Sequence, residues 1–453
     1  MDLEKMAVDM IQWGKTGHLF RSMRKEMKIN QEELADEFIS ASTISNIELN
    51  VRNVHPEKYI YLAKKLGILE KILGLVTEKE KHEQEVRAMM SELEELMHVD
   101  PKMAVERVNQ LDIGDVPIVA PVKCYIEGVH HYYEKQWDHA HACFQKTIGH
   151  VNSLPELENS NLYAASLNQI SRVFHFQGKY TEALECVEKG LKVFVRDGER
   201  RVNLYHLLLN RSIYLNRLEK VELAYEAIKE LYDEIEFLKE NNRFLEIPLD
   251  IVIHMYVMFG IILRKLNQPQ KALSYADEGA MIALNNKNFD QLLDLRVVCG
   301  NVYFILGNLT EAQKYYIKAL ELEGKITPSK KYLLIPAYQS LGLTYLELKM
   351  WSQAQEMLEK AVDISDREGR KIWTIDLFIS LGRCSAGQKL YKDAVNYYQQ
   401  AEKLALQHDK GSSLHEIIAL LCSCYERIND IESLHSYKEK LYDVSMETWG
   451  CKV

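Results

Sequence analysis

The stretch LGLTYLELKMWSQAQEMLEKA, residues 341–361, decides the fold, because its pattern returns forty residues later as LGRCSAGQKLYKDAVNYYQQA, residues 381–401. Both copies start with Leu-Gly and place an alanine thirteen residues after the leucine, at Ala354 and Ala394. Apolar and small residues at this spacing predict two amphipathic helices joined by a short turn. The small residues allow the two antiparallel helices to pack closely.

The pattern recurs along most of the chain with a period near forty residues. A small or apolar residue in the second helix of each unit sets the register at Ala140, Ala183, Val221, Ala272, Ala312, Ala354, Ala394 and Leu434. The stretch MSELEELMHVDPKMAVERVNQL, residues 90–111, adds a first, atypical pair. These repeats resemble tetratricopeptide repeats, which implies a right-handed superhelix of about nine helix pairs over residues 76–453. An unrelated helical bundle is the alternative.

Composition agrees with an all-α fold. The chain of 453 residues is 47% hydrophobic and contains only 21 Gly and 9 Pro, which argues against many turns and against disorder. Its length exceeds one ordinary core, so we expect two or more domains or a repeat array. No stretch reaches 18 uninterrupted apolar residues, and the start of the chain lacks a secretory pattern. We therefore expect a cytoplasmic protein that does not bind membranes.

Patterns typical of catalysis are missing from the sequence. There is no Gly-rich phosphate loop, H-E-x-x-H or G-x-S-x-G, and the eight cysteines lack C-x-x-C spacing. The densest histidine cluster includes His139 and His141, which lie two apart on a predicted helix and so diverge. We expect no enzyme, and no catalytic residue, metal or cofactor.

Charge is distributed unevenly along the chain. Residues 1–75 carry 11 Lys and Arg against 11 Asp and Glu, so the net charge of −10 belongs to the remaining 378 residues. An acidic repeat region repels nucleic acid. Any DNA contact is therefore expected to be local and confined to the N-terminal segment.

The N-terminal segment predicts four short helices. Leu19, Met23 and Met27 form one apolar stripe, and Asn30 and Glu33 have the spacing of a capping box. A second helix is expected to start at Gln31, to carry Leu34, Ala35 and Phe38 inward, and to stop near Ile39 and Ser40.

The third helix is expected from Ser40 to about Glu48, with Ile44 and Ile47 on its apolar face. A fourth helix follows Pro56 and ends at Gly67. Small polar residues cover the outer face of the third helix: Ser42, Thr43, Ser45 and Asn46. Short hydrogen-bonding side chains of this kind let a helix approach base edges in the major groove.

The order of these residues resembles the Xre/lambda-repressor type of helix-turn-helix over roughly residues 17–70, within a predicted domain of residues 1–75. The resemblance implies that the third helix reads DNA, that Gln31 supports it, and that Glu48 pairs internally with Arg24. The family often has Gly near position 50, where this chain has Asn50. The predicted DNA-binding residues are Gln31, Ser42, Thr43, Ser45, Asn46 and Arg52. A helical cap or dimerisation unit without DNA binding is the alternative.

In a tetratricopeptide array, the first helix of each pair lines the concave wall. Reading the inward positions gives Asn168, Arg172, His206, Asn210, Arg264, Asn301, Gln339 and Arg383. Side-chain amides can replace the missing strand partner of an extended peptide, and arginine can bind its carboxylate. Simple solvation of these side chains in an open superhelix is the alternative.

A DNA reader followed by a peptide-sized groove resembles the peptide-pheromone receptors of Gram-positive bacteria, the Rap/NprR/PlcR/PrgX/Rgg family, and the NprR branch in particular. The resemblance implies a quorum-sensing transcription regulator whose operator is double-stranded DNA. It also implies that a short signalling oligopeptide lies along the concave surface and that the protein forms homodimers or higher homo-oligomers.

The runner-up is an adaptor that sequesters a partner protein such as a response regulator, with the N-terminal helices as docking surface. A phage-encoded or plasmid-encoded regulator of the same build is a third possibility.

Overall fold

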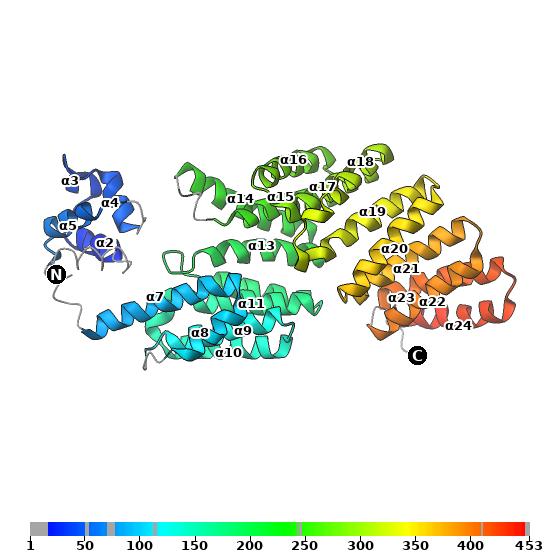
Figure 1. Cartoon of the computed structure of the whole chain (residues 1–453), viewed down its shortest axis with the longest axis horizontal. Coiled ribbons are helices and arrows are strands. Elements are labelled where there is room, and N and C mark those ends of the chain that lie inside the picture. The colour runs from blue at the N-terminus through cyan, green and yellow to red at the C-terminus, as the bar shows by residue number, and fades with distance from the viewer. Residues whose placement is uncertain are drawn as a thin grey trace. The chain divides into compact units, whose positions relative to one another are not determined.

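The computed structural model describes residues 17–49, 54–69, 78–111, 116–241, 243, 247–408 and 411–448. Within these ranges every regular element is a helix, as the sequence predicts (Figure 1). Four helices form the N-terminal part: α2 (Gly17–Glu26), α3 (Gln31–Leu34), α4 (Ala41–Glu48) and α5 (Pro56–Lys65).

The helices that follow in the described ranges form nine consecutive pairs. They are α7 (Glu78–Val99) and α8 (Pro101–Gln110); α9 (Val119–Tyr133) and α10 (Trp137–Ser153); α11 (Leu162–Phe176) and α12 (Tyr180–Val193); α13 (Val202–Arg217) and α14 (Val221–Glu240); α15 (Leu249–Lys265) and α16 (Pro269–Asn285); α17 (Phe289–Ile305) and α18 (Leu309–Leu320); α19 (Leu334–Glu347) and α20 (Trp351–Arg367); α21 (Lys371–Gly387) and α22 (Tyr391–Gln407); α23 (Gly411–Arg427) and α24 (Ile431–Thr448). The short 3-10 helices η1 (Pro155–Ser160), η3 (Glu323–Lys325) and η4 (Pro328–Leu333) lie in connections. The first, atypical pair expected from the sequence is therefore α7 with α8.

Contacts divide the described chain into two compact units. The first comprises described residues within Met1–Gly178 and Lys192–Arg201, and the second those within Lys179–Leu191 and Val202–Val453. The predicted boundary between residues 75 and 76 lies in a stretch, 70–77, outside the described residues. That boundary stays a prediction.

A single apolar cluster holds the N-terminal helices together. Its fully buried members include Phe20, Ile39, Ile44, Ile47 and Leu62. The capping box is present as predicted, because the Glu33 amide donates to Asn30 Oδ1 (2.8 Å) and the Asn30 amide donates to Glu33 Oε2 (3.0 Å). Helices α4 and α5 also lie where the sequence places them, and α5 ends before Gly67, whose φ is +62°.

The predicted apolar stripe on the first of these helices is wrong. Leu19 and Met27 are exposed, Met23 is half-buried, and the buried residue is Phe20. The inward side of the helix carries Phe20, Met23 and Arg24: Phe20 joins the apolar cluster, and Arg24 bonds to the buried Glu48. A periodicity that counts only apolar residues does not register this polar inward contact.

The second helix is shorter than predicted. Helix α3 ends at Leu34, and Phe38, expected to face inward, is 48% exposed. The Asp36 carboxylate accepts from the Phe38 and Ile39 amides (2.9 and 3.0 Å), which gives the backbone an alternative to helix. Lys65 and Tyr61 hold that carboxylate in place and keep the pKa of Asp36 well below its usual range.

Alanine sets the contact between paired helices. The fourth residue of each second helix from α8 to α22 is an alanine with no exposed surface: Ala104, Ala140, Ala183, Ala224, Ala272, Ala312, Ala354 and Ala394. The register predicted at Val221 is therefore wrong by three residues, because Val221 is the first residue of α14 and stays half-buried. The final helix, α24, has Leu434 at the equivalent position.

Glycine gives several first helices the same close approach. A Cβ added to Gly300 or Gly382 would collide with the ring of Tyr316 or Tyr398, in each case sixteen residues later in the chain. Gly128 faces Phe144 and Gly342 faces Leu358 with the same offset. The Leu-Gly motif of the repeat is thus a packing requirement.

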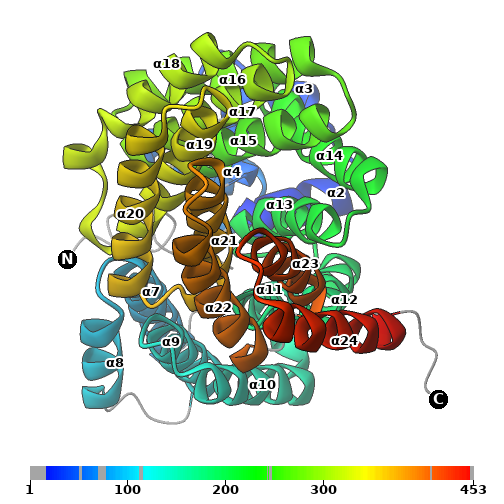
Figure 2. The same cartoon turned by 90° about the vertical axis from the view of Figure 1, so that its right-hand side faces the viewer.

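Within the second unit, the first helices of successive pairs form an inner layer. Helix α15 contacts α13 and α17, and α19 contacts α17 and α21. The second helices from α14 to α22 each pack against the first helix of their own pair and that of the next pair, as α16 does with α15 and α17. Figure 2 shows α16 and α18 on the outer side of α15 and α17. A first helix is therefore covered on most of its sides.

We expect Gly382→Ala to destabilise the α21–α22 pair by about 1–3 kcal/mol, because the new methyl group meets the buried ring of Tyr398. Amide hydrogen exchange in these two helices measures the change. Gly149→Ala in α10 is the matched control, since no described atom lies within 4 Å of its added Cβ. There, alanine's higher helix propensity should leave α10 unchanged or more stable by up to about 1 kcal/mol. Equal losses at both sites would contradict the packing argument.

Candidate functional site

Helix α4 presents the polar face that the sequence predicts. Ser42 and Asn46 are exposed, Thr43 and Ser45 are half-buried, and Ile44 on the opposite side has no exposed surface. None of the described residues bonds to the Asn46 side chain, so its amide is available to an external partner. Arg52, the remaining predicted contact, lies outside the described residues.

The N-terminus of α4 is tied by hydroxyl groups. Ser40 caps the helix by accepting from the Thr43 amide (3.2 Å), and the Ser40 Oγ also lies 2.9 Å from both Ser42 Oγ and Thr43 Oγ1. These bonds satisfy an amide that the helix itself cannot pair. The hydrogen bond to Ser40 therefore fixes the position of the exposed Ser42 hydroxyl.

A buried carboxylate fixes the other end of α4. Glu48 accepts two bonds from the Arg24 guanidinium, from Nε at 2.5 Å and Nη2 at 2.9 Å, and a third from the Gln31 amide at 2.7 Å. The bond to Glu48 raises the pKa of Arg24. The pairing of Glu48 with Arg24 is as predicted, and it ties α2 and α3 to the end of the candidate reading helix. Gln31 uses its amide nitrogen internally.

Helix α2 also touches the backbone of α4. A Cβ on Gly17 would lie 2.5 Å from the carbonyl oxygens of both Ile47 and Glu48. Main-chain oxygens cannot swing aside as a side chain can. Only glycine therefore lets α2 begin at this point, and the sequence pattern did not single it out.

We expect Glu48→Gln to destabilise the N-terminal helices by about 3–5 kcal/mol, because it leaves a largely buried arginine without its counter-charge. Amide hydrogen exchange in α2 and α4 measures the loss. Glu57→Gln is the control, since Glu57 is exposed and should change stability by no more than about 0.5 kcal/mol. If α4 of the Glu48 variant keeps its protection from exchange, the bonds to Glu48 do not hold these helices together.

On α15 and α17, two inner helices of the second unit, the solvent-accessible part is a narrow stripe. Of residues 251–263 in α15, His254 and Ile261 alone keep appreciable exposure, and they lie seven residues apart on one face. On α17, Asp294 and Asn301 are half-buried at the same spacing, with Gln291 and Arg296 beside them. Any ligand of this layer must be recognised through these few side chains.

Asn301, a predicted site residue, joins two inner helices. Its Oδ1 accepts from Tyr316 Oη (2.7 Å) on α18 and from Ser340 Oγ (3.3 Å) on α19. Both donors are satisfied by the amide oxygen, so the amide nitrogen is left to donate. An amide nitrogen that remains able to donate can bind a peptide carbonyl.

The other predicted groove residues of the second unit differ in their surroundings. His206, Asn210, Arg264 and Gln339 are half-buried, which suits a groove lining. Arg383 is exposed and already pairs with Glu416, at 2.6 Å. The repeat spacing placed all of these residues on inner helices but did not distinguish paired from unpaired charges.

Two predicted residues belong to α11 in the first unit. Asn168 is only 2% exposed, so little of it is open to a ligand in this conformation. Arg172 donates to Gln169 Oε1 (2.8 Å) and lies over the ring of Tyr132, 4.5 Å from its centroid. Their roles in ligand binding stay predictions.

His254 and Asp294 were missed from the sequence. Each lies five residues before the register position of its helix, Phe259 in α15 and Cys299 in α17. The earliest position predicted to face inward lies two residues before the register position, which is one helical turn later. His254 and Asp294 occupy equivalent places forty residues apart on two first helices, and this repeated spacing is visible in the sequence.

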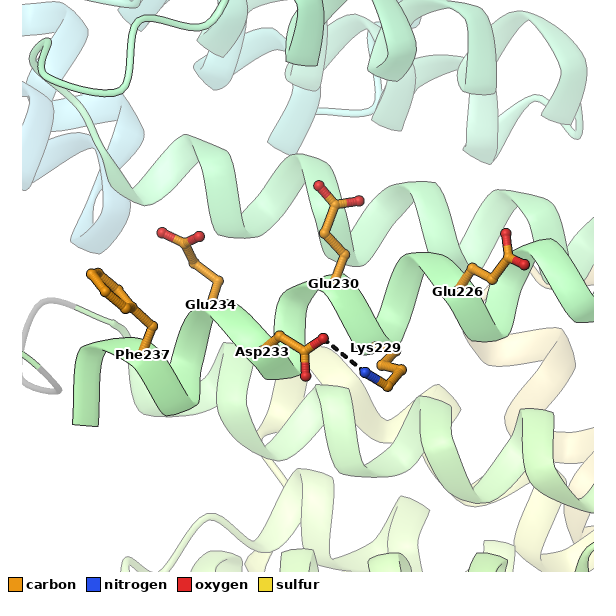
Figure 3. Close-up of a pocket in the computed structure, with 6 residues that line it drawn as sticks. All are labelled: Glu226, Lys229, Glu230, Asp233, Glu234 and Phe237. Carbon is orange, nitrogen blue, oxygen red and sulfur yellow. Dashed lines mark hydrogen bonds and ion pairs between the residues drawn. The ribbon is translucent and has the colours of Figure 1, made fainter. Parts of the chain in front are cut away.

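A shallow hollow of about 420 Å³ lies on α14, outside the inner layer (Figure 3). Its lining is mostly acidic: Glu226, Lys229, Glu230, Asp233, Glu234 and Phe237. Lys229 pairs with Asp233 at 2.9 Å, and Glu230 pairs with Arg211 at 3.0 Å. This face is a solvated helix surface that would repel nucleic acid.

The described ranges also bear on metal sites, membrane-spanning helices and reactive thiols. Those ranges hold no group of three or more His, Cys, Asp or Glu side chains arranged to bind a metal ion. None of their helices combines the length and apolar character that crossing a bilayer demands. Burial raises the pKa of Cys186 to about 11, as expected of an unreactive thiol.

Comparison with known proteins identifies the two parts. A helix-turn-helix family model matches residues 20–71, and a tetratricopeptide-repeat family model matches residues 299–367 and 332–407. Among curated proteins, the outer dynein arm-docking complex subunit 4 of Danio rerio is 31% identical over 134 residues, and that of Xenopus laevis is 25% identical over 162. The chain spans only 26% and 28% of the length of these two relatives.

Solved structures resemble much more of the chain. The apo form of the quorum sensor NprR from B. thuringiensis has a TM-score of 0.55 at 14% identity, covering 80% of this chain and 99% of its own. A Rap protein complexed with competence and sporulation factor has a TM-score of 0.50 at 13% identity, covering 72% and 98%. A signal-transduction ATPase with a tetratricopeptide-repeat sensor, from Pyrococcus horikoshii, has a TM-score of 0.55 at 14% identity, covering 95% and 66%.

At these identities the structural similarity establishes the fold. The chain therefore combines an Xre-type helix-turn-helix with tetratricopeptide repeats and folds like NprR and Rap, two members of the peptide-pheromone receptor family that its sequence resembles.

Proposed function

We propose that this protein is a DNA-binding transcription regulator controlled by a short signalling peptide bound to the inner helices of its repeats. The observation that carries the proposal is the exposed polar face of α4, which the hydrogen bonds to the buried Glu48 hold in place. The same chain also contains a repeat array. A reading helix needs its side chains held at fixed positions relative to the bases. The three bonds to Glu48 and the cap at Ser40 supply that rigidity.

Peptide binding is supported by the chemistry of the inner layer. The accessible stripe on α17 offers the amide nitrogen of Asn301, and neighbouring inner helices add His206, Asn210, Arg264 and Gln339. NprR is described as a quorum sensor, and the Rap structure holds competence and sporulation factor. By analogy, we assign a signalling oligopeptide to the inner surface of this chain.

Regulation follows from the weakness of a single reader. The N-terminal segment has no excess of positive charge, so one copy gains little from phosphate contacts. Two readers held about 34 Å apart, one turn of DNA, bind far more tightly. We propose that the repeats form homodimers or higher oligomers and that the peptide shifts the population of spacings that fit the operator. A coupling of about 1–3 kcal/mol would change occupancy about 5- to 150-fold.

Selection from a pool of random double-stranded DNA by the full chain tests the DNA-binding part. We expect enrichment of a defined, two-fold-related motif. Asn46→Ala should then weaken binding to the enriched duplex by about 1–3 kcal/mol, roughly 5- to 150-fold, because it removes a contact to a base edge. Binding is measured by fluorescence anisotropy at fixed salt.

Ser22→Ala is the control, since the Ser22 side chain is exposed on α2 and donates only to its own helix backbone. It should bind the duplex as the wild type does. A folded wild type that enriches no motif would favour the adaptor, in which the N-terminal helices dock a partner such as a response regulator. If the Asn46 variant binds the duplex with full affinity, α4 is not the helix that contacts the bases.

A further inference from the structure

Two oppositely charged side chains on neighbouring inner helices of the second unit form no ion pair or hydrogen bond with any described residue. They are Arg264 near the end of α15 and Asp294 in the first half of α17. Within the described ranges, no carboxylate or carbonyl accepts a bond from Arg264, and no donor bonds to Asp294. Arg383, by contrast, pairs with Glu416.

Both charges have lost much of their water. Burial lowers the pKa of Arg264, and burial together with the nearby Asp290 raises the pKa of Asp294 to about 7. Taking a charge out of water without a counter-charge is unfavourable. These two side chains are therefore suited to a ligand that supplies a negative charge to Arg264 and a positive charge to Asp294.

The groups around Asp294 are committed elsewhere. Lys330 pairs with Asp290 at 3.2 Å, and Thr327 donates to the same carboxylate through its amide and hydroxyl. His254 holds the equivalent position on α15, and burial lowers its pKa, so it is neutral at pH 7. Asp250 lies one turn before His254 on the same helix. The nearest cation, Lys330, thus leaves the Asp294 carboxylate unpaired.

The spacing of the two charges has the length of a short peptide. Arg264 lies ten residues beyond His254, the equivalent of Asp294, so the two sites differ by about 15 Å along the helix axes. Adjacent helices lie about 8–10 Å apart, which makes the separation about 17 Å. An extended chain covers that distance with about five or six residues. Asn301, seven residues after Asp294, offers its amide nitrogen along the way.

We propose that Asp294 binds an ammonium group of the peptide and Arg264 binds its carboxylate, so that the ligand is a chain of about five or six residues with opposite charges at its two ends. This inference rests on the proposed function. The ammonium comes either from the free N-terminus or from a lysine side chain at the first residue, and the carboxylate is the C-terminus.

Synthetic hexapeptide pools test the assignment. Each pool is random over uncharged residues, and the pools differ only at their ends: both ends free, amine acetylated, carboxylate amidated, or acetylated with lysine first and the carboxylate free. The full chain is mixed with each pool and separated by size, and mass spectrometry measures the peptides retained. We expect the wild type to retain a pool with both charges at least tenfold better than one lacking either charge. The better of the two ammonium pools identifies the source.

Substitutions then connect each preference to one residue. Asp294→Asn should abolish the preference for an ammonium and leave the preference for a free carboxylate. Arg264→Gln should do the reverse, and Arg264→Lys should restore part of the carboxylate preference. Asp376→Asn, at the equivalent place on α21, and Arg367→Gln, on the second helix α20 where Arg367 pairs with Asp363, are controls that should keep both preferences. Far-ultraviolet circular dichroism confirms that each variant is folded.

The pH dependence gives a second readout. An ammonium needs the ionised Asp294, so retention of the acetylated lysine pool should rise about tenfold from pH 6 to pH 8, as a carboxyl with a pKa of about 7 ionises. Asp294→Asn should remove this rise.

Failure of the inference and failure of the proposed function give different results. Retention of no pool by the folded wild type would overturn peptide binding itself. Retention without charge preference, or a preference that survives in both Asp294→Asn and Arg264→Gln, would overturn the assignment of the two residues and leave peptide binding standing.

Discussion

In four helix pairs, a glycine of the first helix faces a bulky side chain sixteen residues later, in the second helix: Gly128 and Phe144, Gly300 and Tyr316, Gly342 and Leu358, Gly382 and Tyr398. The buried alanine at the fourth residue of the second helix completes the contact. Two helices that approach this closely bury nearly the whole surface between them. The packing of the helix pairs depends on this close contact.

The close packing decides how few side chains can meet a ligand. An inner helix such as α15 touches its own partner, the preceding second helix and two neighbouring first helices, so only a stripe at seven-residue spacing remains accessible. On α15 and α17 the chemistry of the inner surface therefore depends on a few residues per helix. A single change at Asn301 or Asp294 would remove one of the few polar groups that this surface offers to the proposed peptide.

The candidate DNA reader uses the same strategy on a smaller scale. Its outward face is polar and short, while the inward side is held by Ile44, Ile47 and the buried Glu48. Glu48 lies at the end of α4 and receives donors from α2 and α3, so three helices meet at one carboxylate. In both parts of the chain, a rigid packed side supports a small number of accessible polar groups.

Local signals predicted most helix boundaries correctly. The capping box at Asn30, the cap at Ser40 and the stop at Gly67 are all read from a few adjacent residues, and all are present. The errors have long-range causes. Helix α3 ends early because Lys65 and Tyr61, 29 and 25 residues away, hold the Asp36 carboxylate at the backbone amides.

The sequence by itself predicted about nine helix pairs, because spacing and small residues repeat along most of it, and the resemblance of its N-terminal residues to a known family implied a helix-turn-helix before them. Only the tertiary structure decided which inner charges are satisfied. Arg383 and Arg264 both lie on inner helices, yet Glu416 reaches the first and no described carboxylate reaches the second. A repeat places residues on a face, but the distance between two side chains on different helices depends on how those helices pack.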